Sequence, residues 1–272
     1  MKMTIENWLK SAETKLKQAG IGTARLDALV LAEDATGHDR THLLSHPELS
    51  VRGPASHKLD AQIRRRMNHE PLAYIRGKTE FYGREFLVDK RVLQPRPESE
   101  TMIDLLKTVV RGPASHTVVD IGTGSGALAI TAKLEIPGAK VIATDIDPGC
   151  LVVAKSNAKK HSVDITFLET DLLDSIESLK DLILIANLPY VPDDFQINSA
   201  ARQEPRLAIF GGSDGLDLYR HLFNQIDTKK LGVNWLLTES MPPEHAKLAE
   251  LAKKHGFNLQ QTDDFIQLFV KP

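Results

Sequence analysis

Four consecutive residues near position 190 could hold a nitrogen atom in place for chemistry. They follow the apolar run at 182–186 and are Asn187, Leu188, Pro189 and Tyr190. A planar amide nitrogen shares its lone pair with the carbonyl group and is a poor nucleophile, so a catalyst must hold it in line with an electrophilic carbon. The side-chain oxygen of Asn187 and the carbonyl oxygen of Leu188, which the following proline keeps open, could accept both N–H bonds. The alternative is an ordinary exit from a strand into a loop, since Asn and Pro are common turn formers.

A glycine-rich segment upstream has the features of a nucleoside-binding turn. Residues 120–126 read Asp-Ile-Gly-Thr-Gly-Ser-Gly and lie between a predicted strand at 118–121 and a predicted helix at 127–134. Glycine lets the backbone turn tightly and approach a ligand closely, and the helix that follows offers free N–H groups. Asp145 ends the next predicted strand, where its carboxylate could accept hydrogen bonds from both hydroxyls of a ribose.

Two cofactors are compatible with the glycine segment. Gly122, Gly124 and Ala127 satisfy the dinucleotide fingerprint G-x-G-x-x-A, which would make the protein a nicotinamide-dependent dehydrogenase. The form with an acidic residue before the glycines instead resembles the S-adenosylmethionine-dependent methyltransferases, in which Asp120 would face the ammonium group of the methionine. On this interpretation the cofactor-binding residues of the segment are Asp120, Gly122, Thr123, Gly124 and Gly126.

Two later positions favour the methyltransferase. Asp171 and Leu172 follow the third predicted strand, at 165–168, where Asp171 could accept a hydrogen bond from an adenine amino group and Leu172 could cover the ring. A plain cap of the following turn is the alternative. Asn187 follows the fourth strand, at the edge of the sheet where open α/β folds bind ligands, and we count it in both the cofactor site and the acceptor site. These features, in this order, predict S-adenosylmethionine as the cofactor and no metal ion.

The pattern along the chain predicts three parts. Residues 1–72 carry apolar residues at helical spacing and predict a helical domain. Residues 73–94 predict a linker with a β-hairpin that turns at Gly83 and Arg84. Residues 95–272 alternate strands with helices, which predicts an α/β domain with a mostly parallel sheet and helices on both faces.

Composition limits the partners and the compartment. The N-terminus lacks the apolar core of a signal peptide, no stretch has the length of a membrane span, and the single Cys150 fits a reducing compartment, so we expect a cytoplasmic protein without a membrane partner. A net charge of −2 gives no overall attraction to nucleic acid. The only basic cluster is at 64–66, which we interpret as a solvated helix face.

Five further segments resemble a single family, the HemK (PrmC) family of peptide-chain release factor glutamine methyltransferases. They are Arg-Leu-Asp-Ala at 25–28, Glu-Pro-Leu-Ala-Tyr-Ile at 70–75, Glu-Phe-Tyr-Gly at 80–83, Gln-Pro-Arg-Pro-Glu-Ser-Glu at 94–100 and Glu-Pro-Arg-Leu-Ala-Ile-Phe-Gly-Gly at 204–212. The resemblance covers nearly the whole chain. It implies a class I S-adenosylmethionine-dependent methyltransferase fold with a seven-stranded sheet, preceded by a small helical bundle and a hairpin linker.

The resemblance also implies a reaction and a partner. The reaction is methylation of the side-chain amide nitrogen of the glutamine in the Gly-Gly-Gln motif of peptide-chain release factors, which the helical domain would help to dock. The side-chain oxygen of Asn187 and the carbonyl of Leu188 would each accept one amide N–H, Pro189 would fix the turn, and Tyr190 would pack against the amide and exclude water. No general base is obvious.

A different substrate class stays open from the tetrapeptide alone. Asn-Leu-Pro-Tyr is the form seen in ribosomal RNA adenine dimethylases, so the amino group of adenine in RNA or DNA is the alternative acceptor. Enzymes of that kind extract a base from its stack and usually carry an extended basic surface. The sequence shows no such surface, and we expect no stable binding of nucleic acid.

The chain departs from the family pattern at three places. Leu188 replaces a commoner proline, residues 237–243 replace Glu-Ile-Gly after the fifth strand, and residues 263–265 replace a longer loop in the last hairpin. We expect these departures to lie away from the chemistry. Arg96 has two interpretations, a residue at the cofactor pocket or a surface ion-pair residue, and residues 204–206 are likewise either part of the substrate side or structural.

Overall fold

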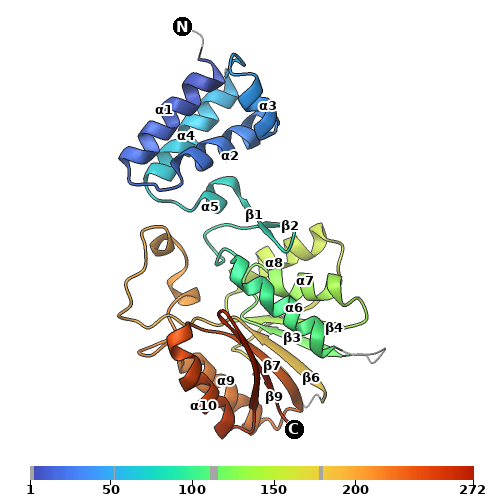
Figure 1. Ribbon diagram of the computed structural model, residues 1–272. Helices are drawn as coiled ribbons and strands as arrows, with labels where there is room; N and C mark the ends of the chain where they lie inside the picture. Colours follow the sequence, from blue (N-terminus) through green and yellow to red (C-terminus); the bar gives the residue numbers. More distant parts are fainter. Residues whose placement is uncertain (1–2, 52, 111–115, 178–179) are drawn as a thin grey trace. The chain divides into compact units, whose positions relative to one another are not determined.

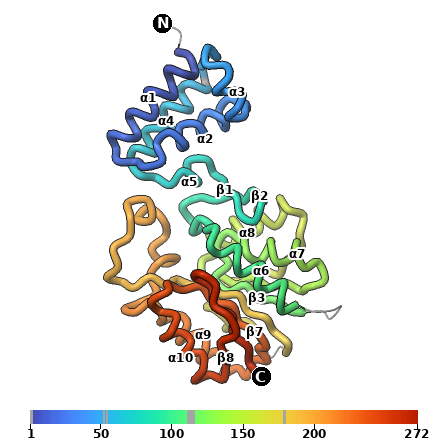
Figure 2. The backbone as a smooth tube through the Cα atoms, viewed as in Figure 1, coloured from blue at the N-terminus to red at the C-terminus, as the bar shows by residue number. Residues whose placement is uncertain are grey.

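The computed structural model describes residues 3–51, 53–110, 116–177 and 180–272, shown as a ribbon in Figure 1 and as a backbone tube in Figure 2. The chain divides into two compact units, one formed by residues 1–77 with 198–203 and the other by residues 78–197 with 204–272. Within the described residues, no helix is long and apolar enough to cross a membrane.

The first unit is a bundle of helices around one apolar core. Its helices are α1 (Ile5–Gln18), α2 (Ala24–Thr36), α3 (Arg40–Ser45), α4 (Pro54–Met67) and α5 (Leu72–Arg76), with a 3₁₀ turn at Ala201–Gln203. Trp8, Leu16, Leu31 and Leu59 are buried together in the core, as the helical spacing of the apolar residues predicts. The predicted helical bundle is confirmed, and α5 is an additional short helix.

The basic cluster on α4 is used inside this unit. The Arg66 guanidinium donates to the Asp27 carboxylate over 2.7 Å, and both side chains are largely buried. Arg65 forms an ion pair with Glu70 over 2.7 Å through its Nε. Two of the three arginines are therefore ion-pair partners, and the interpretation of the whole cluster as a solvated face is wrong for Arg66.

The second unit is built on a seven-stranded sheet. Its strands are β3 (Thr117–Ile121), β4 (Lys140–Asp145), β5 (Thr166–Glu169), β6 (Leu182–Ala186), β7 (Val233–Glu239), β8 (Asn258–Asp263) and β9 (Ile266–Val270), in the spatial order β5-β4-β3-β6-β7-β9-β8. The first five pair in parallel, and β9 is antiparallel to both of its neighbours. The strand order reverses between β3 and β6, and open α/β sheets bind ligands at the carboxyl edge of such a point.

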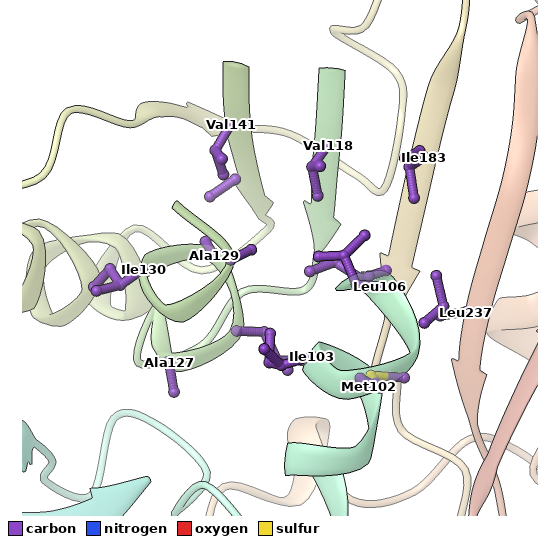
Figure 3. Packing of buried hydrophobic residues seen from close by; sticks show 14 of the residues in the cluster. Met102, Ile103, Leu106, Val118, Ala127, Ala129, Ile130, Val141, Ile183 and Leu237 are labelled. Atoms are coloured by element: carbon purple, nitrogen blue, oxygen red, sulfur yellow. The ribbon is translucent and has the colours of Figure 1, made fainter. Parts of the chain in front are cut away.

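Helices cover both faces of this sheet. Successive side chains of a strand point to opposite faces, and in the central strands the side chains on both faces are apolar and buried. The helices are α6 (Glu100–Val109), α7 (Ala127–Glu135), α8 (Pro148–Lys160), α9 (Asp217–Thr228) and α10 (His245–Lys254). Val118 and Ile183 pack with Ile103 of α6 and Ala129 of α7 (Figure 3), whereas the adjacent strand residues face a second cluster with α9 and α10. The predicted mostly parallel sheet is confirmed. Helix α6 was not among the predicted elements.

The predicted hairpin is present at the start of this unit. Strands β1 (Lys78–Phe81) and β2 (Arg84–Leu87) pair in antiparallel fashion. The turn lies at Tyr82 and Gly83, one residue earlier than predicted, and both have positive φ angles, 52° and 67°. Two-residue hairpin turns of this kind match the twist of the strands. The prediction placed Gly83 first in the turn because glycine favours positive φ angles. In the structure Tyr82 takes that first position, although tyrosine rarely adopts the left-handed conformation.

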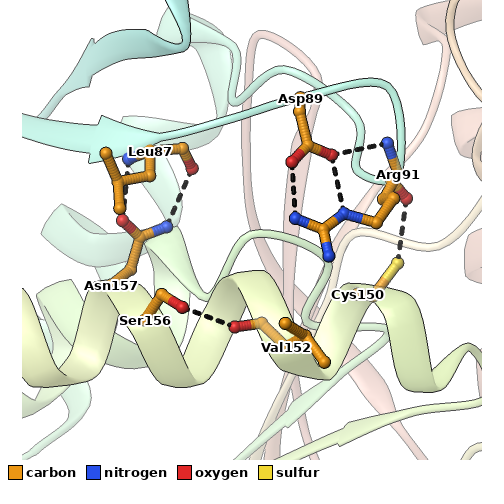
Figure 4. Close-up of polar contacts among 7 residues, drawn as sticks. All are labelled: Leu87, Asp89, Arg91, Cys150, Val152, Ser156 and Asn157. Carbon is orange, nitrogen blue, oxygen red and sulfur yellow. Dashed lines mark hydrogen bonds and ion pairs between the residues drawn. The ribbon is translucent and has the colours of Figure 1, made fainter.

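The buried Asn157 amide on α8 binds the end of the hairpin (Figure 4). The Asn157 side chain on α8 accepts from the Leu87 N–H over 2.7 Å and donates to the Leu87 carbonyl and to the Ser125 carbonyl, each over 2.9 Å. Further along, the Cys150 thiol donates to the Arg91 carbonyl over 3.2 Å. Asn157 thus joins β2, α8 and the glycine segment.

We predict that Asn157→Leu destabilises the protein, because it leaves the buried carbonyl of Ser125 and the part-buried N–H and C=O of Leu87 without their partner. Each unsatisfied buried group costs about 1–3 kcal/mol. Urea denaturation measures the loss. Ser156→Ala is the matched control, since the Ser156 hydroxyl only donates to Val152 on the exposed face of the same helix; its effect should stay within about 0.5 kcal/mol. Equal stabilities of the two variants would contradict this role.

Candidate active site

A cavity of about 210 Å³ lies at the carboxyl edge of the sheet. Its lining includes residues that directly follow or end β3, β4, β5 and β6, together with parts of 91–99 and 205–208. Nine predicted site residues line it: Gly122, Thr123, Gly124, Asp145, Asp171, Leu172, Asn187, Leu188 and Pro189. The remaining predicted residues, Asp120, Gly126 and Tyr190, are not among the residues that line it.

The register of the sheet explains why these residues meet. Ile121 of β3 pairs with Thr144 of β4 on one side and with Ala186 of β6 on the other, and Ala186 in turn pairs with Thr238 of β7. The next residues along these four strands are Gly122, Asp145, Asn187 and Glu239. One transverse row of the sheet therefore carries the glycine segment, the predicted ribose ligand, the predicted acceptor and a carboxylate that was not predicted.

The glycine segment turns through three left-handed residues. Gly122, Gly124 and Gly126 have φ angles of 70°, 54° and 80°, which residues with a side chain rarely adopt. A Cβ at Gly126 would lie 3.1 Å from the Cβ of Ala154, so this glycine allows α7 to pack against α8. A Cβ at Gly124 would meet no atom within 4 Å, and Gly124 lines the cavity, so its missing side chain leaves room for a ligand.

Asp120 holds the turn from behind. Its Oδ2 accepts from the Thr123 hydroxyl over 2.6 Å and from the Ala129 N–H over 3.1 Å. The side chain is buried, and burial raises the pKa of Asp120 to about 7. These hydrogen bonds connect the glycine segment to the first turn of α7. The contact of Asp120 with the ammonium group of the cofactor stays a prediction.

Asp145 connects β4 to the glycine segment. One carboxylate oxygen accepts from the Gly124 N–H over 2.8 Å, and the other accepts from the Asp147 N–H over 2.9 Å. Burial raises the pKa of this carboxyl group. Each carboxylate oxygen can accept a further hydrogen bond, so the group remains able to bind two hydroxyls in the cavity.

The turn after β5 is held in a strained conformation. Leu172 has a φ angle of 47° and is buried, although a bulky residue disfavours the left-handed region. Gln225 of α9 supports the turn, because its side chain accepts from the Leu173 N–H over 2.8 Å and donates to the Asp171 carbonyl over 3.3 Å. Strained residues of this kind concentrate at functional sites, and the Asp171 side chain stays partly exposed at the cavity.

The Asn187 amide is bound on one side only. Its Nδ2 donates to the Ser99 hydroxyl over 2.9 Å, and the Ser99 hydroxyl donates to the Glu239 carboxylate over 2.6 Å. Among the described residues, neither the Oδ1 of Asn187 nor the carbonyl oxygen of Leu188 accepts a hydrogen bond. The two predicted acceptors are therefore both available in residues that line the cavity.

Tyr190 lies beside this arrangement. Its hydroxyl donates to the second oxygen of Glu239 over 3.0 Å, and burial raises the pKa of the phenol. The expectation that residues 237–243 lie away from the chemistry is wrong, because Glu239 contacts both Tyr190 and Ser99. The predicted packing of Tyr190 against a substrate stays a prediction.

The family-like segment at 204–212 packs with its backbone against residues 187–191, which include the acceptor tetrapeptide and are called the acceptor turn below. Val191 and residues 209–211 exchange hydrogen bonds of 3.0 and 2.9 Å. A Cβ at Gly211 would lie 2.2 Å from the Pro189 carbonyl oxygen, and a Cβ at Gly215 would lie 2.1 Å from the Tyr190 carbonyl oxygen. Both glycines are needed because two stretches of backbone touch at these points.

Arg96 lies at the cavity and also forms an ion pair, so elements of both sequence interpretations apply to it. It lines the cavity, and its guanidinium donates to the Glu204 carboxylate over 2.6 Å. Glu204 is buried, and its burial raises the pKa of that carboxyl group. The ion pair joins the segments 94–96 and 204–208, both of which border the cavity. Glu204 thus has a structural role beside the site, and Pro205 lines the cavity.

The main residues missed from sequence are Ser99, Glu239 and Gln225. Ser99 belongs to the segment 94–100, which had signalled a family resemblance without a role for the serine. Glu239 stood in a segment that departs from the family pattern. Gln225 lies within α9, where no local signal distinguishes it from other polar helix residues.

Comparison with known proteins matches both units. Residues 7–77 match the family described as the PrmC N-terminal domain, and residues 98–203 match the methyltransferase small domain. The chain is 36% identical to the release factor glutamine methyltransferase of Koribacter versatilis over 87% of this chain and 86% of the relative. It is 33% identical to that of Deinococcus radiodurans over 96% of this chain and 95% of the relative.

Solved structures share the fold at low sequence identity. The catalytic domain of hMettl16 in complex with an RNA hairpin superposes with a TM-score of 0.53 at 15% identity, covering 80% of this chain and 81% of that chain. A 16S rRNA methyltransferase of T. thermophilus, in complex with AdoMet and guanosine, superposes with a TM-score of 0.51 at 18% identity, covering 71% of this chain and 49% of that chain. The predicted class I methyltransferase fold is confirmed. With relatives of this identity along almost its whole length, the chain belongs to the release factor glutamine methyltransferase family.

Proposed function

We propose that the protein transfers a methyl group from S-adenosylmethionine to the side-chain amide nitrogen of the glutamine in the Gly-Gly-Gln motif of peptide-chain release factors. The observation that carries the proposal is a pair of oxygens, on Asn187 and Leu188, that accept no hydrogen bond from any described residue and lie beside the glycine segment at the cavity. A primary amide offers two N–H bonds to such a pair. The relatives named as release factor glutamine methyltransferases support the same acceptor.

We infer that the groups lining the cavity fit the nucleoside part of S-adenosylmethionine. We assign the ribose hydroxyls to Asp145, the adenine amino group to Asp171 and the cover of the ring to Leu172. The open space at Gly124 and the remaining acceptor capacity of the buried Asp145 fit a ligand that brings hydroxyl donors. The Asp120 carboxylate, the Thr123 hydroxyl and Gly126 keep the turn in shape behind the ligand.

The residues around the acceptor contribute mainly alignment. When bound, S-adenosylmethionine supplies a methyl group made electrophilic by its sulfonium. Asn187 Oδ1 and the Leu188 carbonyl accept the two N–H bonds of the amide, so that the nitrogen points at this carbon. Pro189 fixes the turn, and Tyr190 excludes water from the amide. Alignment of this kind can contribute roughly 7–11 kcal/mol to catalysis. The nitrogen then loses its extra proton to water.

The alternative acceptor, an adenine amino group in RNA or DNA, has less support. Such enzymes bind phosphates through an extended basic surface, whereas Arg65 and Arg66 of the one basic cluster are engaged by Glu70 and Asp27. We propose instead that the helical domain at 1–72 helps to dock a protein substrate. Since release factors act on ribosomes, we also infer that the protein works in the cytoplasm.

We predict that Asp145→Ala weakens binding of S-adenosylmethionine roughly ten- to hundredfold, because a hydrogen bond to a charged group contributes about 1.5–3 kcal/mol. Isothermal titration calorimetry measures the dissociation constant. Asp164→Ala, an exposed aspartate before β5, is the control and should bind normally. Unchanged affinity of Asp145→Ala would show that the ribose lies elsewhere.

We predict that Asn187→Ala abolishes methylation of a release factor and leaves the dissociation constant of S-adenosylmethionine within about twofold, since Asp145, Asp171 and Leu172 still bind the cofactor. The assay follows transfer of a labelled methyl group to the release factor. A release factor with Gly-Gly-Ala in place of Gly-Gly-Gln is the substrate control and should stay unlabelled. Full activity of the variant, or labelling of RNA in place of the protein, would overturn the proposal.

We predict that Gly211→Ala lowers kcat about a hundredfold, because the new Cβ would push the Pro189 carbonyl away and displace the acceptor turn. Single-turnover methylation measures the rate. Gly138→Ala is the matched control, since a Cβ there would meet no atom of the described residues within 4 Å, and its rate should equal that of the unmodified protein. A normal rate for Gly211→Ala would mean that the turn tolerates displacement.

A further inference from the structure

The acceptor amide belongs to a buried chain of hydrogen bonds. Asn187 Nδ2 donates to Ser99 Oγ over 2.9 Å, and Ser99 Oγ donates to Glu239 Oε2 over 2.6 Å. Tyr190 donates to the other oxygen of the same carboxylate over 3.0 Å. Ser99 and Glu239 are 2% and 1% exposed, so water does not compete for these groups. Three separate segments therefore meet at one carboxylate.

The direction of this chain follows from the number of protons. An ionised carboxylate only accepts hydrogen bonds, and a serine hydroxyl has one proton to donate. Because Ser99 gives this proton to Glu239, its oxygen can only accept from Asn187. The NH₂ group of the Asn187 amide must then face Ser99, and the Oδ1 atom faces away from it.

The direction matters because an asparagine amide has two nearly isosteric orientations. With Oδ1 at the cavity, the amide accepts an N–H of the substrate nitrogen. With the orientation reversed, its NH₂ group would oppose the N–H bonds of the substrate. The Asn187 side chain alone has no preference between the two, so a neighbour must select one.

We propose that Ser99 and Glu239 are positioning residues that hold the Asn187 amide with its oxygen toward the substrate nitrogen. This inference rests on the proposed methyl transfer at Asn187. The same carboxylate fixes the Tyr190 hydroxyl, so a single buried charge orients two sides of the acceptor pocket. Neither residue was assigned a role by the sequence motifs.

The surroundings of Glu239 are consistent with a carboxylate that orients donors. The Tyr219 hydroxyl of α9 donates to the Glu239 backbone carbonyl over 2.6 Å and to the Ala186 carbonyl over 2.9 Å, which ties β7 to β6. Burial raises the pKa of Glu239, and the negative charge of Glu98 adds to the rise, while the hydrogen bonds from Ser99, Tyr190 and Asn187 oppose it. The donors that face the carboxylate thus favour its ionised form.

The test compares side chains of equal shape. Ser99→Thr keeps the hydroxyl, whereas Ser99→Val has the same shape without it. We expect kcat for the release factor to be roughly ten- to hundredfold lower in Ser99→Val than in Ser99→Thr, with the dissociation constant of S-adenosylmethionine alike in both. Equal kcat values in this pair would overturn the proposal.

If the extra methyl group prevents folding of both variants, Ser99→Ala replaces them. It should lower kcat to a similar extent with a change in KM of less than about threefold, since alignment rather than binding is lost. Glu239→Gln should act on the same step, so the double variant should be no slower than the slower single variant. Additive losses, or a Ser99→Ala kcat within twofold of the unmodified protein, would contradict a shared positioning role.

Asn187→Ala separates this inference from the proposed function. If Asn187→Ala is inactive and Ser99→Ala is fully active, only the positioning role fails. If Asn187→Ala itself keeps full activity, the acceptor assignment fails, and the positioning role fails with it.

Discussion

The site depends on one row of strand pairing. Thr144, Ile121, Ala186 and Thr238 are partners across four parallel strands, so the residues that follow them leave the sheet side by side. Parallel strands place their carboxyl ends at the same edge, and the reversal of strand order between β3 and β6 opens the space there. A shift of this register by one residue would turn every side chain of a strand to the opposite face. The apolar clusters on the two faces therefore fix the strand register, and the register fixes the positions of the site residues.

Hydrogen bonds of buried polar groups hold the loops in fixed positions relative to the sheet. A buried polar group is costly without a partner, and here each partner belongs to a different segment. Asn157 joins the hairpin to the glycine segment, Asp120 joins that segment to α7, and Glu239 joins β7 to the acceptor turn. Breaking any one of these contacts would leave groups unsatisfied on two segments, so the loops share the rigidity of the sheet.

Local patterns were sufficient for most of the fold. The short apolar runs of the strands and the helical spacing in the bundle predicted the elements, because each element must bury its apolar side chains. The turn at Tyr82 was misplaced, since a left-handed tyrosine contradicts propensity. The position of Asp120 could be predicted but its contacts could not, because a motif does not show which way a carboxylate points.

The sequence by itself determined the order of the glycine segment, the acidic residues and the acceptor tetrapeptide, and with it the family and the class of reaction. These signals are local, since a turn or a strand end needs only a few neighbouring residues. The tertiary structure alone decided that Ser99 and Glu239, 140 positions apart, share a hydrogen bond, and that Gly211 touches the Pro189 carbonyl. Contacts of this kind depend on strand order and register, which bring distant segments together after the elements have formed.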